Sequence, residues 1–279
     1  MPEKLPVVAA IPNYNMGQQL VALLPELTSQ GYADVFVLDD ASTDGSREVV
    51  ENFNHGSGGV QFVTRAENKG AGSTRNLIIR ALGYDAIIHF IDADVTLKTE
   101  HIPEVVYDVM PNGPVGFVGG LLLTPEGIQS VWNYGPHQGF RGDVGANIQA
   151  RIEPLLINNP DKANTIREHF SRLLEDWPDP LRAPVRRQVF WNVEANLLMR
   201  SDVFAKLGGF DEKLREHEIQ DLAIRVHNIG LLGYFDPSIS VLHKNEQNVR
   251  EYNRLTAMLK AELYIARKHS FRSWLKSGS

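Results

Sequence analysis

The stretch Ile87-Ile88-His89-Phe90-Ile91-Asp92-Ala93-Asp94 is the part of the sequence that most clearly indicates the fold. Its first five residues are mostly β-branched or aromatic, which indicates a buried central strand. The strand ends in two carboxylates, and an unpaired carboxylate is costly to bury in a core. In an open α/β sheet, ligands collect at the carboxyl ends of central strands. Asp-x-Asp at such an end suits a divalent cation shared with a substrate phosphate, although a strand end that only meets solvent is the simpler alternative.

Strands and helices alternate regularly over the first third of the chain. Apolar runs predict further strands at residues 7–11, 35–38 and 60–63, and helical spacing or capping residues predict helices near 17–29, 42–50 and 75–82. This alternation predicts a mostly parallel sheet with right-handed crossovers. Because parallel strands end at the same edge, we expect Pro12, Asp40 and the aspartates of residues 92–94 to lie together.

Composition excludes several classes of protein. The 279 residues include no cysteine and carry a net charge of -6, which argues against a disulfide framework, a thiolate metal site and a nucleic-acid-binding surface. No apolar run approaches the ~20 residues of a membrane span, and residues 1–6 do not resemble a signal peptide. We therefore expect a cytoplasmic protein with no nucleic-acid partner.

Two residues near the predicted edge could contact a nucleotide. The Asp40 carboxylate can accept a hydrogen bond from the N3–H of a uracil or from a ribose, and Arg75 is a candidate clamp on a diphosphate. Either could instead be an ordinary turn or helix-surface residue. The glycines at 70–72 are not followed by Gly-Lys-Ser/Thr, and the first strand does not lead into Gly-x-Gly-x-x-Gly. This disfavours ordinary ATPases and nicotinamide dehydrogenases.

Four stretches together resemble the nucleotide-sugar half of family 2 glycosyltransferases, which are enzymes of the GT-A fold. In chain order they are residues 8–15 (VAAIPNYN), 37–46 (VLDDASTDGS), 68–76 (NKGAGSTRN) and Asp92-Ala93-Asp94. The resemblance implies a GT-A-like, Rossmann-like α/β fold. Its mostly parallel central sheet would be flanked by helices, with a smaller mixed sheet on the acceptor side.

The resemblance also implies roles for particular residues. The nucleotide sugar would be contacted by Pro12, Tyr14, Asn15, Asp40, Lys69, Arg75, Asp92 and Ala93. The cation would be bound by Asp94, with Asp92 and His243 as further ligands. We expect Mn²⁺ or Mg²⁺, and imidazole beside carboxylates is more compatible with Mn²⁺. A structural role for His243 remains an alternative.

A second acidic motif lies at residues 216–225. Glu218 and Asp221 are three residues apart, so they share one face of a predicted helix's first turn, where the helix dipole favours carboxylates. One of them could accept the proton of an incoming hydroxyl, or both could merely satisfy the helix end. Many family members read Glu-Asp-x-Asp here, with the second residue as the base. That position is Ile219, so we assign proton transfer to Asp221, with Glu218 second, and the choice between inversion and retention stays open.

We expect one GT-A-like domain with a nucleotide-sugar half at residues 1–110 and an acceptor-side half at 111–245. Residues 125–147 are expected to form a strand and loop, and an insertion around 150–190 is expected to hold a helix with Leu173 and Leu174 on its apolar face. Two short strands, 232–235 and 238–243, should precede a C-terminal helix and tail at 246–279. That helix packs on the domain or pairs with another subunit, and basic and aromatic residues near its end could contact a membrane surface.

The function expected from these features is transfer of a sugar from a UDP- or GDP-sugar to a hydroxyl of a carbohydrate or other acceptor. The reaction is expected to need a divalent metal and to invert the anomeric centre. One alternative is a catalytically idle nucleotide-sugar or carbohydrate binder, because of Ile219. Another is a nucleotidyltransferase on a similar sheet, although the first strand is not followed by a Gly-rich loop with a basic pair.

Overall fold

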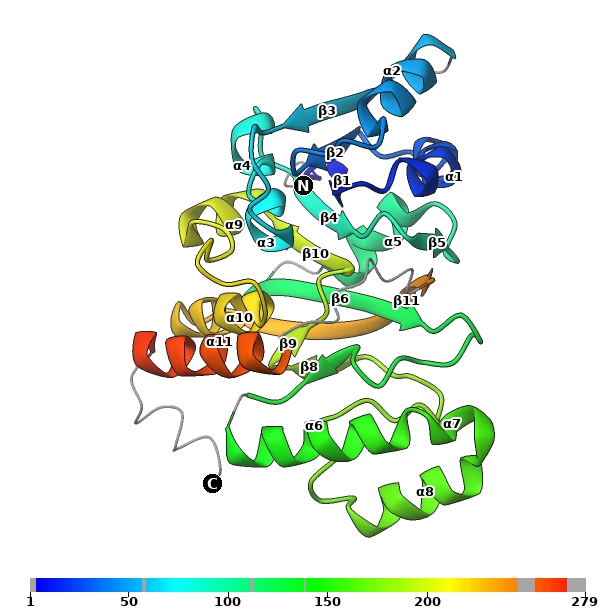
Figure 1. The fold of residues 1–279 in the computed structure, drawn as a ribbon, viewed down its shortest axis with the longest axis vertical. Coiled ribbons are helices and arrows are strands. Elements are labelled where there is room, and N and C mark those ends of the chain that lie inside the picture. Colours follow the sequence, from blue (N-terminus) through cyan, green and yellow to red (C-terminus); the bar gives the residue numbers. More distant parts are fainter. Residues whose placement is uncertain (1–3, 57–58, 111–112, 138, 245–253, 270–279) are drawn as a thin grey trace.

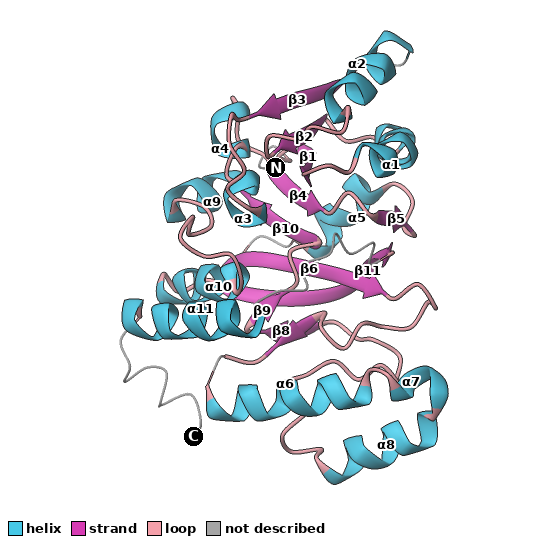
Figure 2. Cartoon of the chain, in the orientation of Figure 1, coloured by secondary structure: helices cyan, strands magenta, loops and turns pink. Residues whose placement is uncertain are grey.

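The computed structural model describes residues 4–56, 59–110, 113–137, 139–244 and 254–269. The strands of its main sheet are β1 (Val7–Asn13), β2 (Asp34–Asp39), β3 (Val60–Thr64), β4 (Ile87–Ile91), β5 (Val95–Leu97), β6 (Val115–Leu123), β8 (Arg187–Val189), β10 (Asn196–Arg200) and β11 (Leu232–His243). Within the described residues they form one curled sheet in the order β3-β2-β1-β4-β10-β6-β11-β5, with β8 also paired to β11 (Figure 1). The predicted α/β class with helices flanking a central sheet is confirmed (Figure 2).

The first half of the sheet is parallel, as predicted. β1 pairs with β2 on one side and with β4 on the other, and β2 pairs with β3. Asn13 is the register partner of Asp39, and Ala10 is the partner of Phe90. The three strands therefore end nearly level, which brings the residues that follow them to a single edge.

Helices cover both faces of this parallel half, because alternate residues of β1 are apolar on both sides. The helices around the sheet are α1 (Gly17–Ser29), α2 (Ser46–Gly56), α3 (Ala71–Arg75), α4 (Ile78–Ala81), α5 (Ile102–Val109), α9 (Ser201–Leu207) and α10 (Glu218–Asn228), and α11 (Arg254–Lys268) packs on α10. Ala9 and Ile11 pack with the buried leucines of α1. Val8 and Ala10 belong to the core cluster of α4, α9 and α10. Figure 1 shows α1 and α2 on the opposite side of the sheet from α3 and α4.

The second half of the sheet differs from expectation in two places. β11 is a single strand of 12 residues rather than two short strands, and its pairing with β6 shifts register between Phe235 and Ser240. The Asp236-Pro237 sequence that predicts a turn therefore sits at an irregularity within one strand. The short strand β5 was not predicted. It pairs with the end of β11, so that His243 lies opposite Val95.

The region between β6 and β10 is more helical than predicted. It contains α6 (Phe140–Ile152), α7 (Leu155–Asn158) and α8 (Pro160–His169), which form a separate layer at the bottom of Figure 1. The expectation of a loop through residue 147 was wrong. The helix α6 was not predicted because glycines weaken its helical pattern. One of them is needed for packing, since a Cβ at Gly145 would lie 2.3 Å from Trp177 Nε1. The helix expected to include Leu173 and Leu174 ends at His169.

A second, two-stranded antiparallel sheet joins β7 (Tyr134–Gly135) to β9 (Trp191–Asn192), beside the α6 layer. None of the helices in the described part of the chain is both long and apolar enough to cross a membrane. The first residues of the predicted C-terminal helix, 246–253, lie outside the described residues. So do residues 271–274, which carry part of the predicted membrane contact.

His89 in β4 forms a buried polar link at the centre of the sheet. Asn196 uses its amide nitrogen to donate to the carbonyls of Leu121 and Ile239, so its Oδ1 accepts a hydrogen bond from His89 Nε2 over 2.8 Å. His89 Nδ1 then accepts from the Tyr32 hydroxyl, also over 2.8 Å. Burial lowers the pKa of His89 from 6.5 to about 4, although the Asn196 contact acts in the opposite direction.

This burial predicts a loss of stability in acid. The unfolded chain protonates His89 below pH 6.5, whereas the folded chain does so only near pH 4. The contribution of neutral His89 to stability is therefore complete above pH 6.5. As the pH drops toward 4, this contribution to the free energy of unfolding falls, by about 2 to 3 kcal/mol at pH 4.5. Urea unfolding at pH 7 and 4.5 should show a smaller pH effect in His89→Gln than in wild type. His101→Gln, at an exposed position, serves as the control, and equal pH effects in all three proteins would contradict this account.

Candidate active site

The acidic end of β4 lies beside the end of β11. His243 Nε2 is 3.2 Å from Asp94 Oδ1 and 3.8 Å from Asp92 Oδ2. The pairing of β5 with β11 explains this proximity, because His243 faces Val95, the residue directly after Asp94. One possible ligand atom from each of the three side chains lies within 4.8 Å of the others. The structure therefore brings together the three residues predicted to bind a cation.

Arg75 completes one side of this cluster. It is 2% exposed, and its Nη2 donates to Asp92 Oδ1 over 2.6 Å. Its guanidinium also lies over the ring of Phe210, 5.9 Å from the centroid. Its Nε is buried and has no hydrogen-bond partner in the structure. Arg75 thus holds Asp92 in place and keeps one donor group uncommitted.

The charges of the cluster stabilise one another. Burial by itself would raise the pKa of Asp92, but Arg75 and His243 together produce a net lowering. Burial would likewise lower the pKa of His243, but hydrogen bonds and attraction from Asp92 and Asp94 raise it to about 10. Two carboxylates with an imidazole are a plausible donor set for a divalent cation, which binds histidine only in its neutral form.

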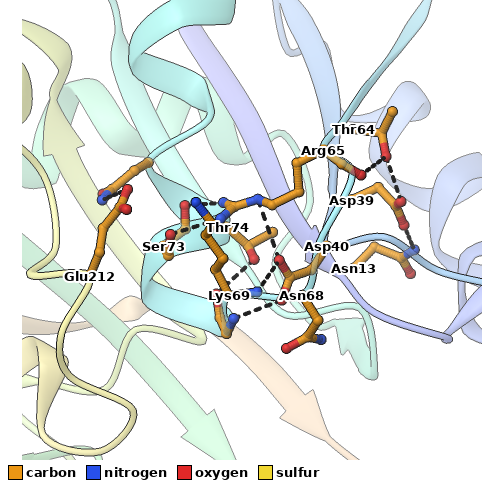
Figure 3. Close-up of polar contacts among 12 residues, drawn as sticks. Asn13, Asp39, Asp40, Thr64, Arg65, Asn68, Lys69, Ser73, Thr74 and Glu212 are labelled. Atoms are coloured by element: carbon orange, nitrogen blue, oxygen red, sulfur yellow. Dashed lines mark hydrogen bonds and ion pairs between the residues drawn. The ribbon is translucent and has the colours of Figure 1, made fainter.

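Asp40 lies at the same edge, and its carboxylate is fully engaged by the protein. Its Oδ1 accepts from the backbone N–H of Lys69 over 2.9 Å, and its Oδ2 accepts from that of Gly70 over 2.8 Å (Figure 3). Arg65 Nε lies 3.4 Å from Asp40 Oδ1. Asp40 therefore fixes the turn that leads into α3, and with it the position of Arg75.

Arg65 is a site residue that the sequence analysis missed. Its guanidinium lies between Asp40 and Ser73, donating to the Ser73 hydroxyl over 2.8 Å and also to the Ser73 carbonyl (Figure 3). It thereby ties the end of β2 to α3. The sequence feature that could have identified Arg65 is its position just after β3, at the edge where the other parallel strands end.

The predicted contacts after β1 line the same edge. Asn13 donates to Asp39 Oδ1 over 2.8 Å, and Asp39 Oδ2 accepts from Thr64 over 2.9 Å (Figure 3). Asn15 adopts φ 54°, and its side chain accepts from the backbone N–H of Thr43. The predicted residue Tyr14 is 43% exposed, so its ring is accessible. Pro12, half-buried, precedes these residues in β1, and Ala93 is buried between the two aspartates.

The N-terminus of α10 packs closely against α3. A Cβ at Gly72 would lie 3.0 Å from Glu218 Cγ and 3.2 Å from Phe210 Cβ, so a glycine is needed at this contact. Glu218 is 7% exposed, and no hydrogen bond to its carboxylate is present among the described residues. The predicted carboxylate Glu218 therefore packs against α3, the short helix that ends in Arg75.

Asp221 has different surroundings. It is fully buried, and its carboxylate contacts Arg225 Nε at 2.8 Å, Lys268 Nζ at 2.8 Å and His269 Nε2 at 2.7 Å. Burial would raise the pKa of Asp221, but these three partners lower it to about 2. Asp221 thus ties the end of α11 to α10. Its predicted role as proton acceptor stays a prediction.

Replacing Asp221 by asparagine separates the two roles. The neutral amide would leave buried cations without their counter-charge, so we expect the free energy of unfolding at pH 7 to fall by about 2 to 4 kcal/mol. Nucleoside diphosphate binding should be unchanged under conditions where the variant is folded. Asp161→Asn, at an exposed position of α8, is the control for both measurements. A variant as stable as wild type but without turnover would instead support proton transfer by Asp221.

One further carboxylate, Glu194, belongs to this region, although no role was predicted for it from the sequence. It precedes β10, and the carbonyl of the next residue, Ala195, accepts from the backbone N–H of Asp92 over 3.3 Å. Burial raises the pKa of Glu194 to about 7, with Arg75 acting to lower it and Glu218 to raise it. The sequence feature that could have identified Glu194 is its position as a lone acidic residue at the start of an apolar strand.

Comparison with known sequences gives a family match. The sequence model of glycosyl transferase family 2 matches residues 8–173. The chain is also similar to an N-acetylglucosaminyl-diphospho-decaprenol L-rhamnosyltransferase of Mycobacterium tuberculosis. The two are 26% identical over 287 residues, which cover 97% of this chain and 86% of the relative.

Two solved structures share the fold at low sequence identity. One is the mannosyltransferase PcManGT from Pyrobaculum calidifontis in complex with GDP-Man and Mn²⁺, with a TM-score of 0.61 and 15% identity. The other is GalNAc-T7 with UDP, GalNAc and Mn²⁺, with a TM-score of 0.64 and 13% identity. Each alignment covers 96% of this chain, but only 65% of the first structure and 48% of the second. These similarities confirm the predicted GT-A fold.

Proposed function

Because this chain belongs to glycosyl transferase family 2, we propose that it moves a sugar from a nucleotide-diphosphate sugar to an acceptor hydroxyl, with the help of a divalent cation. The observation that carries this proposal is the cluster of Asp92, Asp94 and His243 beside the buried Arg75, at the edge where β1, β2 and β4 end. Acidic ligands for a cation and a buried guanidinium together suit a diphosphate leaving group.

The nucleoside would lie along the ends of β1 and β2. Pro12, Tyr14 and Asn15 follow this edge, and the exposed ring of Tyr14 is available to a base. Asp40 supports the turn at Lys69 and Gly70 through its two backbone hydrogen bonds. We therefore propose that Asp40 supports nucleotide binding by holding this turn in position, in addition to any direct contact with the nucleotide.

The donor set fits a resident cation. Asp94, Asp92 and His243 would hold it, and their mixture of oxygen and nitrogen atoms favours Mn²⁺ over Mg²⁺. When bound, it would supply positive charge for the diphosphate. Arg75 would add a second positive charge on the side of Asp92 and would limit the build-up of negative charge as the leaving group departs.

The acceptor is proposed to bind on the side of β8, β9 and the α6–α8 layer. A cavity of about 360 Å³ lies there. Its polar and aromatic lining includes His137, Arg172, Asp176, Arg187, Phe190 and His227. Such a lining suits a carbohydrate, which presents both hydroxyl groups and apolar ring faces. The Mycobacterium relative is named for a lipid-linked acceptor, so a lipid-linked sugar bound at a membrane surface belongs among the candidates.

For an inverting reaction, a carboxylate must accept the acceptor proton. The residues predicted for this role are Asp221 and Glu218. Asp221 already has three cationic partners, whereas Glu218 packs against α3 without a hydrogen-bonding partner among the described residues. Of the two, Glu218 is the carboxylate that remains available to contact the acceptor hydroxyl.

The direct test is release of nucleoside diphosphate from a panel of sugar nucleotides. The panel should include UDP-sugars, GDP-mannose and a nucleotide-activated L-rhamnose, each with and without Mn²⁺ after removal of bound metal. Lipid-linked N-acetylglucosaminyl diphosphate should be tried as acceptor. We expect metal-dependent release with one donor, and NMR of the product would then show whether the anomeric centre is inverted.

Two results would favour the alternatives. Thermal stabilisation by UDP or GDP without turnover of any donor would indicate an idle binder, for which the buried Ile219 at the usual base position is the supporting observation. Release of diphosphate from a nucleoside triphosphate and a sugar phosphate would indicate a nucleotidyltransferase.

A further inference from the structure

Five acidic residues lie at the edge of the sheet on the side of α10, and their partners differ. Asp92 is bonded to Arg75, and Asp94 contacts His243. Asp221 is fully buried among cations. Glu218 and the half-buried Glu194 differ from these three, since neither carboxylate receives a side-chain hydrogen bond within the described part of the chain.

Glu194 is placed by backbone structure and not by side-chain bonds. It stands just before β10, which inserts antiparallel between β4 and β6 (Figure 1). Ala195 continues this pairing through its bond to the backbone of Asp92. The backbone of Glu194 is therefore held beside the acidic turn. Its carboxylate accepts a hydrogen bond from its own backbone N–H, has no side-chain donor among the described residues, and lies within electrostatic reach of Arg75, Glu218 and Asp92.

A partly buried carboxylate with a single backbone donor needs further hydrogen-bond donors, because leaving its remaining acceptor sites unpaired is costly. A second carboxylate next to it cannot supply one while both are ionised. A hydroxyl group can do so, since its O–H donates to the carboxylate. Glu194 next to the Asp92 backbone, with Glu218 and Arg75 close enough to act on its charge, thus suits an incoming alcohol.

We propose that Glu194, paired with Glu218, receives the acceptor hydroxyl and takes its proton during transfer. This inference rests on the proposed glycosyl transfer and assigns to Glu194 the task that Ile219 cannot perform. The acceptor oxygen forms its bond to the anomeric carbon as the bond from that carbon to the diphosphate oxygen breaks with its electron pair. The hydroxyl proton passes to the Glu194 carboxylate, and the nucleoside diphosphate leaves.

The test compares Glu194→Gln with wild type and with Glu51→Gln, a change at an exposed glutamate of α2. The assay follows nucleoside diphosphate release from the donor that the panel identifies, with glycerol or the identified acceptor. We expect kcat to fall at least ~100-fold in Glu194→Gln, with the donor KM nearly unchanged. Calorimetric binding of UDP or GDP with Mn²⁺ should match that of wild type.

A second variant separates proton transfer from a structural role. Glu194→Ala leaves space for a small carboxylate, so added formate should restore turnover at least ~10-fold, whereas it should not restore Asp94→Asn. Turnover of Glu194→Gln within about threefold of wild type, or absence of formate rescue together with weakened nucleotide binding, would overturn this proposal alone. Absence of turnover in wild type with every donor would overturn the proposed function, and the role of Glu194 with it.

Discussion

Replacing Asp94 by asparagine is expected to lower turnover of the sugar nucleotide at least ~1,000-fold and to remove the effect of Mn²⁺ on nucleoside diphosphate binding. Asp94 is 7% exposed and lies 3.2 Å from His243. The amide keeps the size of the side chain but carries no charge, so the cation loses its most buried anionic ligand. Affinity for UDP or GDP should be measured by calorimetry across Mn²⁺ concentrations, in protein first treated with a chelator.

Asp161→Asn is the matched control for this change, because it removes a carboxylate from an exposed helix position. It should behave as wild type in both assays. The variant at Asp94 should also unfold at a temperature close to that of wild type in metal-free buffer. Full turnover by Asp94→Asn in metal-free buffer would contradict the assignment of this residue as a cation ligand.

Replacing Arg75 by lysine is expected to lower kcat ~100- to 1,000-fold. The guanidinium of Arg75 is planar and can direct one nitrogen to Asp92 while presenting another to a phosphate, whereas an ammonium is a point charge without this geometry. Lysine retains the positive charge, so the half-buried carboxylates of Asp92 and Glu194 keep part of their charge compensation. The measurements are kcat, donor KM and thermal unfolding.

Arg47→Lys provides the control, since Arg47 is exposed on α2, where it forms a long ion pair with Glu51 and lies over the ring of Phe62. Arg75→Ala is less informative, because removing one partner from a buried ion pair costs about 3 to 5 kcal/mol of stability. A well-folded Arg75→Lys enzyme with wild-type kcat would show that Arg75 only supports Asp92. Its proposed contribution to the leaving group would then be wrong.

The parallel half of the sheet could be predicted because its signal is local. The run at residues 87–91 is apolar enough to be buried on both faces, and Asp92 marks where the strand must end. Regular alternation with helices then fixes the direction of neighbouring strands and brings their ends to one edge. The grouping of Arg75, Asp92 and Asp94 followed from this geometry together with the resemblance to a family.

Other parts depend on contacts between distant segments, which spacing does not reveal. The three residues of β5 carry no pattern of their own, yet their pairing with β11 is what places His243 beside Asp94. Glu218 and Asp221 share a turn of α10, but the end of α11 covers Asp221 alone. The helix α6 was missed because its glycines reduce helix propensity while permitting close contact with Trp177.

The central claim, a cation held between acidic side chains and a diphosphate, can be tested by anomalous diffraction from a crystal grown with Mn²⁺ and UDP or GDP. We predict a manganese peak at coordination distance, about 2.0–2.5 Å, from Asp94 and His243, with the diphosphate on its other side near Arg75. An ordered nucleotide whose diphosphate lies away from these residues, or a manganese peak elsewhere in the molecule, would contradict the account.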